Sequence, residues 1–360
     1  MERLPIDEVR PGMYLVRSIE DSTGRVLLKA GTQLTERYIQ RIYELGYPSI
    51  YVGEPWEAEI EVIQPVSNQT KTRVTSSLRD LFTKRGPEQL TDLTEVEQSV
   101  NALVDELLVN QSIVFSLSEI RNHDNYTFLH CVDCCVVSVL MARSLRLPTR
   151  DIRIVGMGAA LHDIGKTLVS QEILCKPARL TKEEYQIVKE HARDGYQMLV
   201  QRSSLDYRAA IVALQHHERI DGTGYPAGIQ GRDTHIFSRI VAVADVFDAI
   251  TSDRVYRKGL GFSQARKFLN DNQHQFDESV LSALSEYVAE YPVGAYVKLD
   301  SGELGVVIRL NWEHQDQPVV NLIADPTGNR YKKPITVNLA SDGRRINEEV
   351  ISLRDSQASF

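Results

Sequence analysis

Histidines and an aspartate recur in the middle of the chain, where each follows a stretch with helical character. The stretches 152–161 and 209–214 are apolar, and a capping box formed by Thr181 and Glu184 opens a third helical segment. The polar residues that follow these segments are His162, Asp163, His191, His216 and His217. Neutral imidazole and carboxylate groups are suitable ligands for Fe, Mn and Zn. The spacing therefore predicts a hydrolytic metal site assembled from helix ends.

Two further polar residues lie inside apolar segments. His130 lies in the stretch 128–141, and Asp245 lies in the middle of the helical pattern 239–247. A carboxylate in apolar surroundings is costly unless a partner neutralises it. Taken singly, each residue is best interpreted as a hydrogen-bonded member of the core. Because the other candidate ligands recur in the same helical region, we expect His130 and Asp245 to join one metal cluster.

The periodicity of apolar residues divides the chain into four parts and predicts a mainly α fold. Residues 1–54 mix short alternating runs with one helical pattern over 35–45, which predicts a small α+β module. Residues 55–93 are polar, and we interpret them as a linker with some helix. Over 94–292 apolar residues recur at three and four positions, which predicts an all-helical domain. Residues 293–360 return to short β-type runs and predict a small β-rich appendage.

The composition is that of an ordinary globular protein. With 360 residues, of which 42% are hydrophobic, the chain can bury a sizeable core. A net charge of -8 argues against a binder of polymeric nucleic acid, which needs many Lys and Arg contacts. An anionic substrate must therefore meet a local basic patch. Since no apolar run approaches the roughly 20 residues that span a bilayer, and no signal pattern is seen, we expect a cytoplasmic protein without membrane contact.

The cysteines do not form the pattern of a secreted disulfide framework. Cys131, Cys134 and Cys135 crowd one apolar segment, and Cys175 stands alone. A zinc site at Cys131 and Cys134 would need a second pair of ligands of this kind, which the sequence lacks. We therefore interpret the crowded cysteines as small, reduced core residues.

Residues 94–292 resemble an HD-GYP domain, a branch of the HD-domain metal-dependent phosphohydrolases. Three segments carry the resemblance in the order that the family has them. They are His162-Asp163-Ile-Gly-Lys166, His216-His217-Glu-x-x-Asp-Gly-x-Gly224-Tyr225-Pro226 and Ala244-Asp245-Val-Phe-Asp248-Ala-x-Thr-Ser-Asp-Arg254-x-Tyr-Arg257. Residues 3–53 are similar to the small domain of unassigned role that precedes many HD-GYP domains.

The resemblance implies hydrolysis of a cyclic dinucleotide, chiefly cyclic di-GMP to linear pGpG, by a hydroxide that bridges two metals. It assigns one metal to His130, His162, Asp163 and Asp245. It assigns the other to Asp163, His191, His216 and His217, with Asp163 bridging. We expect iron or manganese, because the ligands are nitrogen and oxygen. We expect two metals rather than three, because Tyr126 stands where three-metal members carry an additional carboxylate.

The resemblance also implies contacts to the substrate. Lys166 resembles the lysine that contacts the scissile phosphate. Asp248 would orient a neighbouring group or transfer a proton. Arg254 and Arg257 resemble contacts to the phosphate and base on the other side of the substrate. Read without the resemblance, Lys166 would be an ordinary solvated lysine and the two arginines a basic surface turn.

The segment Gly224-Tyr225-Pro226 has two interpretations. Gly and Pro specify a tight backbone path, so the segment could simply fix the loop that follows the histidine pair. Alternatively, Tyr225 is exposed and docks the substrate or a GGDEF-type cyclase, as the resemblance suggests. We favour the first interpretation.

Three alternatives to cyclic di-GMP hydrolysis stay open. Cyclic GMP-AMP would fill a similar pocket, and only hydrogen bonds to the base edges distinguish the two substrates. A receptor that binds a cyclic dinucleotide with little turnover is the second alternative, although it would not need the intact ligand set. A hydrolase of nucleotide polyphosphates is the third. The oligomeric state is also open, with a homodimer as the commonest arrangement.

Overall fold

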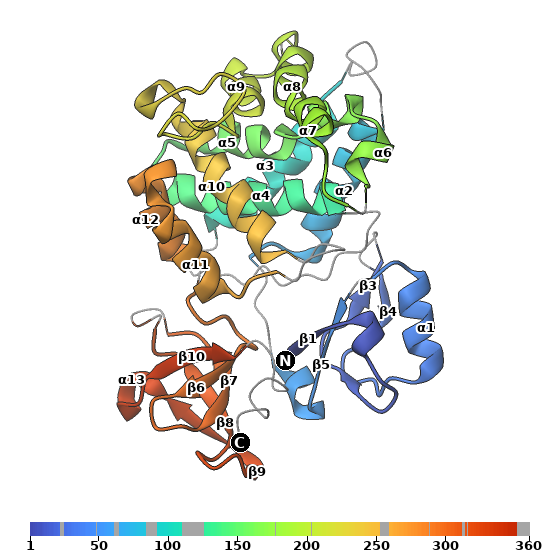
Figure 1. Cartoon of the computed structure of the whole chain (residues 1–360), viewed down its shortest axis with the longest axis vertical. Coiled ribbons are helices and arrows are strands. Elements are labelled where there is room, and N and C mark those ends of the chain that lie inside the picture. The colour runs from blue at the N-terminus through green and yellow to red at the C-terminus, as the bar shows by residue number, and fades with distance from the viewer. Residues whose placement is uncertain are drawn as a thin grey trace.

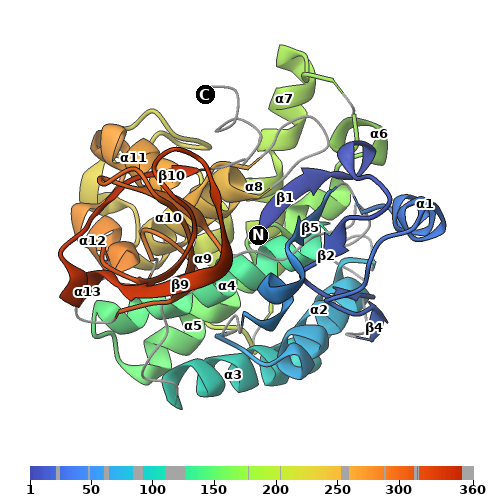
Figure 2. The same ribbon diagram turned by 90° about the horizontal axis from the view of Figure 1, so that it is seen from below.

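The chain forms a helical part flanked by two small modules that contain sheets (Figure 1). The computed structural model describes residues 1–21, 25–47, 49–60, 65–83, 92–109, 126–176, 178–202, 204–252, 259–287, 289–311, 314 and 316–350. The two small modules, blue and red, lie side by side beneath the helices in Figure 1, and Figure 2 shows the same arrangement from below. The mainly α fold expected from the sequence, with small sheets at both ends, is confirmed.

The N-terminal module is a small α+β unit. Its elements are β1 (Glu2–Pro5), the 3₁₀ turn η1 (Ile6–Glu8), β2 (Tyr14–Leu15), β3 (Ile19–Glu20), β4 (Val26–Leu28), α1 (Glu36–Glu44), β5 (Ser49–Gly53) and η2 (Pro55–Glu59). Strand β5 pairs antiparallel with both β1 and β2, and β3 pairs with β4. Helix α1 begins where the Thr35 side chain accepts a hydrogen bond from the Tyr38 amide.

The helical part contains the long helices of the chain. Its elements are α2 (Asn68–Phe82), α3 (Thr94–Val109), α4 (Tyr126–Ser144), α5 (Thr149–Leu161), η4 (Ile164–Leu168), α6 (Gln171–Leu174), α7 (Lys182–Lys189), α8 (His191–Val200), α9 (Tyr207–Gln215), η5 (Gly231–Asp233), α10 (Ile236–Thr251), α11 (Phe262–Asp271), η6 (Gln273–Gln275) and α12 (Glu278–Tyr287). Among the described residues, no helix is both long enough and apolar enough to span a membrane.

Helix α4 lies at the centre of the helical part. It packs against α5, α10 and α12, and its residues 130–142 are buried on every face. A helix buried on every face needs apolar residues all round, which is why this segment contains only Val, Cys, Leu, Met and Ala apart from His130, Asp133 and Ser138. Helix α7 begins at the expected capping box, in which Thr181 and Glu184 exchange hydrogen bonds.

Helix α2 lies within the stretch 55–93 that the sequence suggests is a linker. Its Val74, Leu78 and Leu81 are buried in the same core as α3 and α4. Between them Asp80 is exposed, whereas the hydroxyls of the buried Thr75 and Ser77 donate to backbone carbonyls of α2. The apolar spacing over 74–81 is that of an amphipathic helix. The structure therefore joins this part of the expected linker to the helical part.

The C-terminal module is an antiparallel sheet with one short helix. Its elements are β6 (Tyr296–Leu299), β7 (Leu304–Arg309), β8 (Val319–Ala324), β9 (Arg330–Asn338), α13 (Leu339–Asp342) and β10 (Ile346–Val350). The strand order is β10-β6-β7-β8-β9. Alternate residues such as Val297, Leu299, Val307 and Leu322 form its small core.

The two small modules contact each other directly. The hydroxyl of Tyr296 in β6 donates to the carboxylate of Glu57 in η2, at 2.9 and 3.0 Å from its two oxygens. Arg330 of β9 pairs with Glu54. A cavity of about 420 Å³ lies beside these contacts and is lined by residues of both modules, including Tyr14 and Tyr296.

Candidate metal centre

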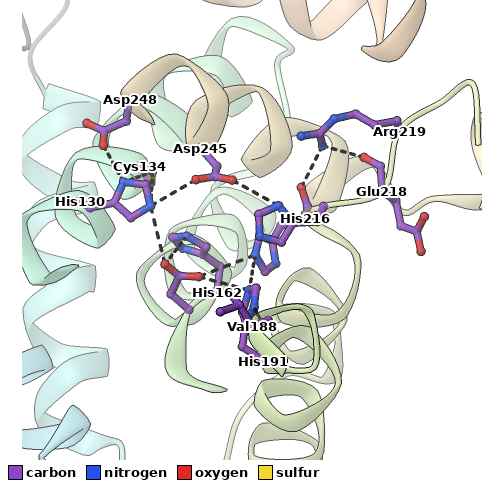
Figure 3. A network of polar contacts seen from close by, with 12 residues as sticks. His130, Cys134, His162, Val188, His191, His216, Glu218, Arg219, Asp245 and Asp248 are labelled. Atoms are coloured by element: carbon purple, nitrogen blue, oxygen red, sulfur yellow. Dashed lines mark hydrogen bonds and ion pairs between the residues drawn. The ribbon is translucent and has the colours of Figure 1, made fainter. Parts of the chain in front are cut away.

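Five helices bring the predicted ligands together. Helix α4 supplies His130, and α10 supplies Asp245 from its middle. The remaining residues lie at helix ends, and they are His162 and Asp163 after α5, His191 at the start of α8, and His216 and His217 after α9. Figure 3 shows the side chains of His130, His162, His191, His216 and Asp245 pointing toward one another. Because α4, α5, α9 and α10 pack closely, residues that are far apart in the sequence form one buried cluster.

Backbone carbonyl groups fix the orientation of three imidazoles. The Nδ1 atoms of His162, His191 and His216 donate to carbonyl oxygens of Ala159, Val188 and Ala213, each three residues earlier. A carbonyl oxygen can only accept, so Nδ1 must carry the proton in each ring. Each Nε2 is therefore left with a lone pair directed into the cluster, which is the form that binds a metal.

Asp163 lies between two groups of imidazoles. Its Oδ2 atom is 3.8 Å from Nε2 of His130 and 3.5 Å from Nε2 of His162. Its Oδ1 atom is 3.4 Å from Nε2 of His191 and 3.8 Å from Nε2 of His216. One carboxylate thus presents an oxygen to each group, which is the geometry that a bridging ligand requires.

Asp245 makes a second link across the cluster. Its Oδ1 atom lies 3.2 Å from Nε2 of His130, and its Oδ2 atom lies 3.6 Å from Nδ1 of His217. The ring of His217 in turn lies against that of His216, with centroids 4.0 Å apart. The candidate ligands therefore form one connected set rather than two separate sites.

The electrostatics keep His162, His191, His216 and Asp163 in the forms that bind cations. Burial lowers the pKa of His191 to about 4 and also lowers the pKa values of His162 and His216. Burial opposes ionisation of Asp163, yet Lys166 and the nearby imidazoles hold the pKa of its carboxyl well below its ordinary value. At neutral pH these imidazoles are neutral and the Asp163 carboxylate is charged.

Two buried atoms in the cluster have no hydrogen-bond partner, namely Nε2 of His162 and Oδ1 of Asp163. Their side chains are 0% and 1% exposed, so leaving them unpaired is costly unless something else satisfies them. Nitrogen and carboxylate oxygen atoms around a buried centre are ligands of divalent transition metals. The residues present therefore fit a metal centre.

A glycine sets how closely the turn η4 approaches helix α8. A Cβ atom on Gly165 would lie 2.0 Å from the carbonyl oxygen of His191 and 2.6 Å from the amide nitrogen of Gly195. Only glycine permits this approach. The contact places Asp163 and Lys166, on either side of Gly165, next to His191.

Lys166 and Asp248 occupy different positions relative to the cluster. The Lys166 ammonium donates to Oδ2 of Asp163 at 2.5 Å and keeps 28% of its side chain exposed, so it lies between the cluster and solvent. Asp248 is 0% exposed and accepts from Nδ1 of His130 at 2.5 Å, on the side of the ring away from Asp245 (Figure 3). Of the two roles expected for Asp248, this geometry favours orientation of His130.

Comparison with known proteins places the chain in a family. Residues 123–280 match the family model described as HD domain. A cyclic di-GMP phosphodiesterase of Pseudomonas aeruginosa is 36% identical over 288 residues, which make up 80% of this chain and 68% of that protein. The chain belongs to the HD-GYP phosphodiesterase family.

Two further similarities concern the substrate class and the fold. The 3'3'-cGAMP-specific phosphodiesterase 3 of Vibrio cholerae is 36% identical over 162 residues, or 45% of this chain and 35% of that protein. The solved structure of an HDG"Y"P protein from Bdellovibrio bacteriovorus covers 79% of this chain and 98% of that one, with a TM-score of 0.51 and 16% identity. The latter likeness describes the fold alone.

The loop that gives the HD-GYP family its name folds back onto the histidine pair. The ring of Tyr225 stacks on that of His217, with centroids 4.5 Å apart and an interplanar angle of 28°. A Cβ atom on Gly224 would lie 2.5 Å from the carbonyl oxygen of His217, so only glycine fits there. Glu218, which is buried, accepts hydrogen bonds from the amides of Ala227 and Ile229. The loop is thus fixed beside a candidate ligand, with Tyr225 half-buried rather than fully exposed.

Some expected residues lie outside the described part of the chain, and two contributors were not expected. Arg254 and Arg257 fall outside the described residues, and Tyr126 is described only as the first residue of α4. Cys134 lies against His130 in this HD-GYP site, although the sequence suggested only a core residue. Glu218 belongs to the motif that begins at His216, but the sequence assigned it no role. Its spacing before the loop is a signal that could have identified it.

Proposed function

We propose that this chain hydrolyses cyclic di-GMP to linear pGpG with two divalent metals. The observation that carries the proposal is the Asp163 carboxylate, which presents one oxygen to each of two groups of imidazoles. The activity named for the Pseudomonas aeruginosa relative, which aligns with most of this chain, supports the choice of substrate.

We assign His130, His162, Asp163 and Asp245 to one metal, and Asp163, His191, His216 and His217 to the other. Iron or manganese suits such nitrogen and oxygen ligands. When bound, the two ions would supply Lewis acidity toward the phosphoryl oxygens and lower the pKa of water.

The protein's own groups bind and orient the reacting phosphodiester. The partly exposed Lys166 side chain offers a positive charge to a phosphate oxygen at the edge of the cluster. Asp248 holds the His130 ring in place from behind. We assign Arg254 and Arg257 to the second phosphate and the bases, and Tyr225 to the substrate rather than to a GGDEF-type partner, because its ring faces His217.

Cyclic GMP-AMP is the second candidate substrate. The similarity to the Vibrio cholerae phosphodiesterase favours it, although only 35% of that protein is aligned. The choice between guanine and adenine depends on hydrogen bonds to the base edges. A receptor with little turnover is the third candidate, and the intact ligand set argues against it.

Anaerobic turnover of both cyclic dinucleotides, with iron or manganese added to the metal-free protein, tests the proposal. We expect the native chain to open cyclic di-GMP faster, and the product analysis will also reveal any further cleavage to GMP. Asp163→Ala should lose turnover, whereas Asp105→Ala, a change at a surface residue of α3, should not. Tight binding without hydrolysis by the metal-loaded native chain would instead support the receptor.

A further inference from the structure

Cys134 lies one helical turn after His130 on α4, and its side chain is completely buried. Its sulfur is 3.6 Å from Nδ1 and 3.8 Å from Nε2 of His130. Residues four apart on a helix lie on the same face. The thiol is therefore directed to the same side of α4 as the imidazole.

The thiol also lies near the other members of this half of the cluster. His130, Cys134, His162 and Asp245 each offer one donor atom, and these atoms all lie within 4.8 Å of one another. Nε2 of His162 is buried and has no hydrogen-bond partner. The second group, formed by Asp163, His191, His216 and His217, contains no sulfur.

We propose that Cys134 is a metal ligand in the half of the centre formed by His130, His162 and Asp245. This inference rests on the proposed metal-dependent function and adds a donor to it. Bonds of about 2.1 Å from nitrogen and about 2.3 Å from sulfur can together span up to about 4.4 Å. The separation of 3.8 Å between the sulfur and Nε2 of His130 is within that reach. On binding, the thiol proton passes to solvent as the sulfur bonds to the ion.

A sulfur donor changes which ions this half of the centre prefers. Thiolate is a soft ligand that favours zinc or iron, whereas carboxylate and imidazole alone accept manganese more readily. The half with Cys134 would therefore select a softer ion than the half with His191 and His216. The two positions need not hold the same metal.

Cobalt spectroscopy on the full chain provides the test. All variants carry Cys175→Ser, because Cys175 is exposed and could bind added metal. Metal-free protein is titrated with Co²⁺ under anaerobic conditions, and absorption is recorded in the visible and near-ultraviolet ranges. Visible bands report cobalt bound at any ligand set, and a near-ultraviolet charge-transfer band reports a cobalt–sulfur bond. Cys134→Ser is compared with Cys135→Ser, which changes the next residue, equally buried.

We expect the charge-transfer band in the parent and in Cys135→Ser, and its loss in Cys134→Ser. Cobalt binding at one position should weaken at least about 10-fold in Cys134→Ser, because losing a ligand costs no less than losing an outer partner of a ligand. Visible bands without a charge-transfer band in the parent would overturn the inference but leave the metal centre intact. Absence of all cobalt bands would overturn the metal centre itself. If Cys134→Ser does not fold, X-ray absorption of the zinc-loaded parent decides: a sulfur neighbour at about 2.3 Å supports the ligand, and nitrogen and oxygen neighbours alone contradict it.

Discussion

Asp248 is the residue whose position determines its role most clearly. Its carboxylate accepts a hydrogen bond from Nδ1 of His130 and has no exposed surface. Asp248→Asn keeps the size of the side chain but removes its charge. Because outer partners of a metal-binding histidine tune its affinity, we expect metal binding to weaken by about 10- to 100-fold. Titration of the metal-free protein with Mn²⁺ measures this change, and Asp105→Asn is the control.

A direct role of Asp248 in proton transfer predicts a different result. In that case Asp248→Asn would lower kcat at saturating metal and leave metal affinity unchanged. Recovery of kcat when excess metal is added to the variant would support the positioning role.

The buried imidazoles make the metal-free protein sensitive to acid. Folded His191 has a pKa of about 4, below its ordinary value of 6.5. The unfolded chain therefore takes up a proton between pH 6.5 and 4 that the folded chain does not. The free energy of unfolding should fall over this window as the pH drops, by about 3 kcal/mol from this one group. Urea unfolding with chelator present measures it, and His191→Gln should reduce the slope; an equal slope in the variant would contradict the assignment.

The sequence predicted the members of the cluster better than their partners. Residues such as His162 and His216 follow apolar helices, so their convergence could be expected from the burial of those helices. Cys134 was missed because it lies between Cys131 and Cys135 in a mostly apolar stretch of α4, although its spacing from His130 was a signal. The hydrogen bond from His130 to Asp248 joins residues 118 positions apart and depends on how α4 packs against α10. No local pattern contains that information.

At the scale of elements, one buried carboxylate holds the backbone of the loop after α9 in position. Glu218 accepts from two backbone amides, at 2.8 and 3.0 Å, with its two oxygens. Glu218→Gln leaves one amide facing an NH₂ group, so the loop should lose about 1–3 kcal/mol of stabilisation. The stacking of Tyr225 on His217 would loosen, and we expect kcat/KM to fall more than the thermal stability of the whole protein does. Steady-state kinetics test this, with the exposed Glu190→Gln as the control.

An unchanged kcat/KM in Glu218→Gln would mean that the position of the loop does not matter for turnover. Tyr225→Phe separates the ring from its hydroxyl. Because the ring makes the contact with His217, this variant should keep most of the activity if stacking is what matters.

Element boundaries could be predicted where a local signal exists. The capping box of Thr181 and Glu184 opens α7 as expected, and the pattern over 35–45 corresponds to α1. Helix α2 was harder to assign because its polar and basic residues lower its mean hydropathy, while Val74, Leu78 and Leu81 supply the buried face. The packing against α3 and α4 makes that face part of the core.

At the scale of the whole molecule, the N-terminal and C-terminal modules meet. The N-terminal and C-terminal modules are separated by the entire helical part in sequence, yet they lie side by side (Figures 1 and 2). The contact includes the buried pair Glu57 and Tyr296 and the ion pair of Arg330 with Glu54. Sequence periodicity predicts each module separately but carries no information on such a contact.

Tyr296→Phe tests what this contact does. The change removes the hydroxyl that donates to the carboxylate of Glu57, which is 1% exposed, and leaves that charge with one partner fewer. An underpaired buried acceptor costs about 1–3 kcal/mol, so the free energy of unfolding should fall by that amount. Because every candidate ligand comes from the helices α4 to α10 and the turns between them, turnover at saturating substrate should stay unchanged. A fall in kcat with unchanged stability would mean that the paired modules act on the metal centre rather than only supporting the fold.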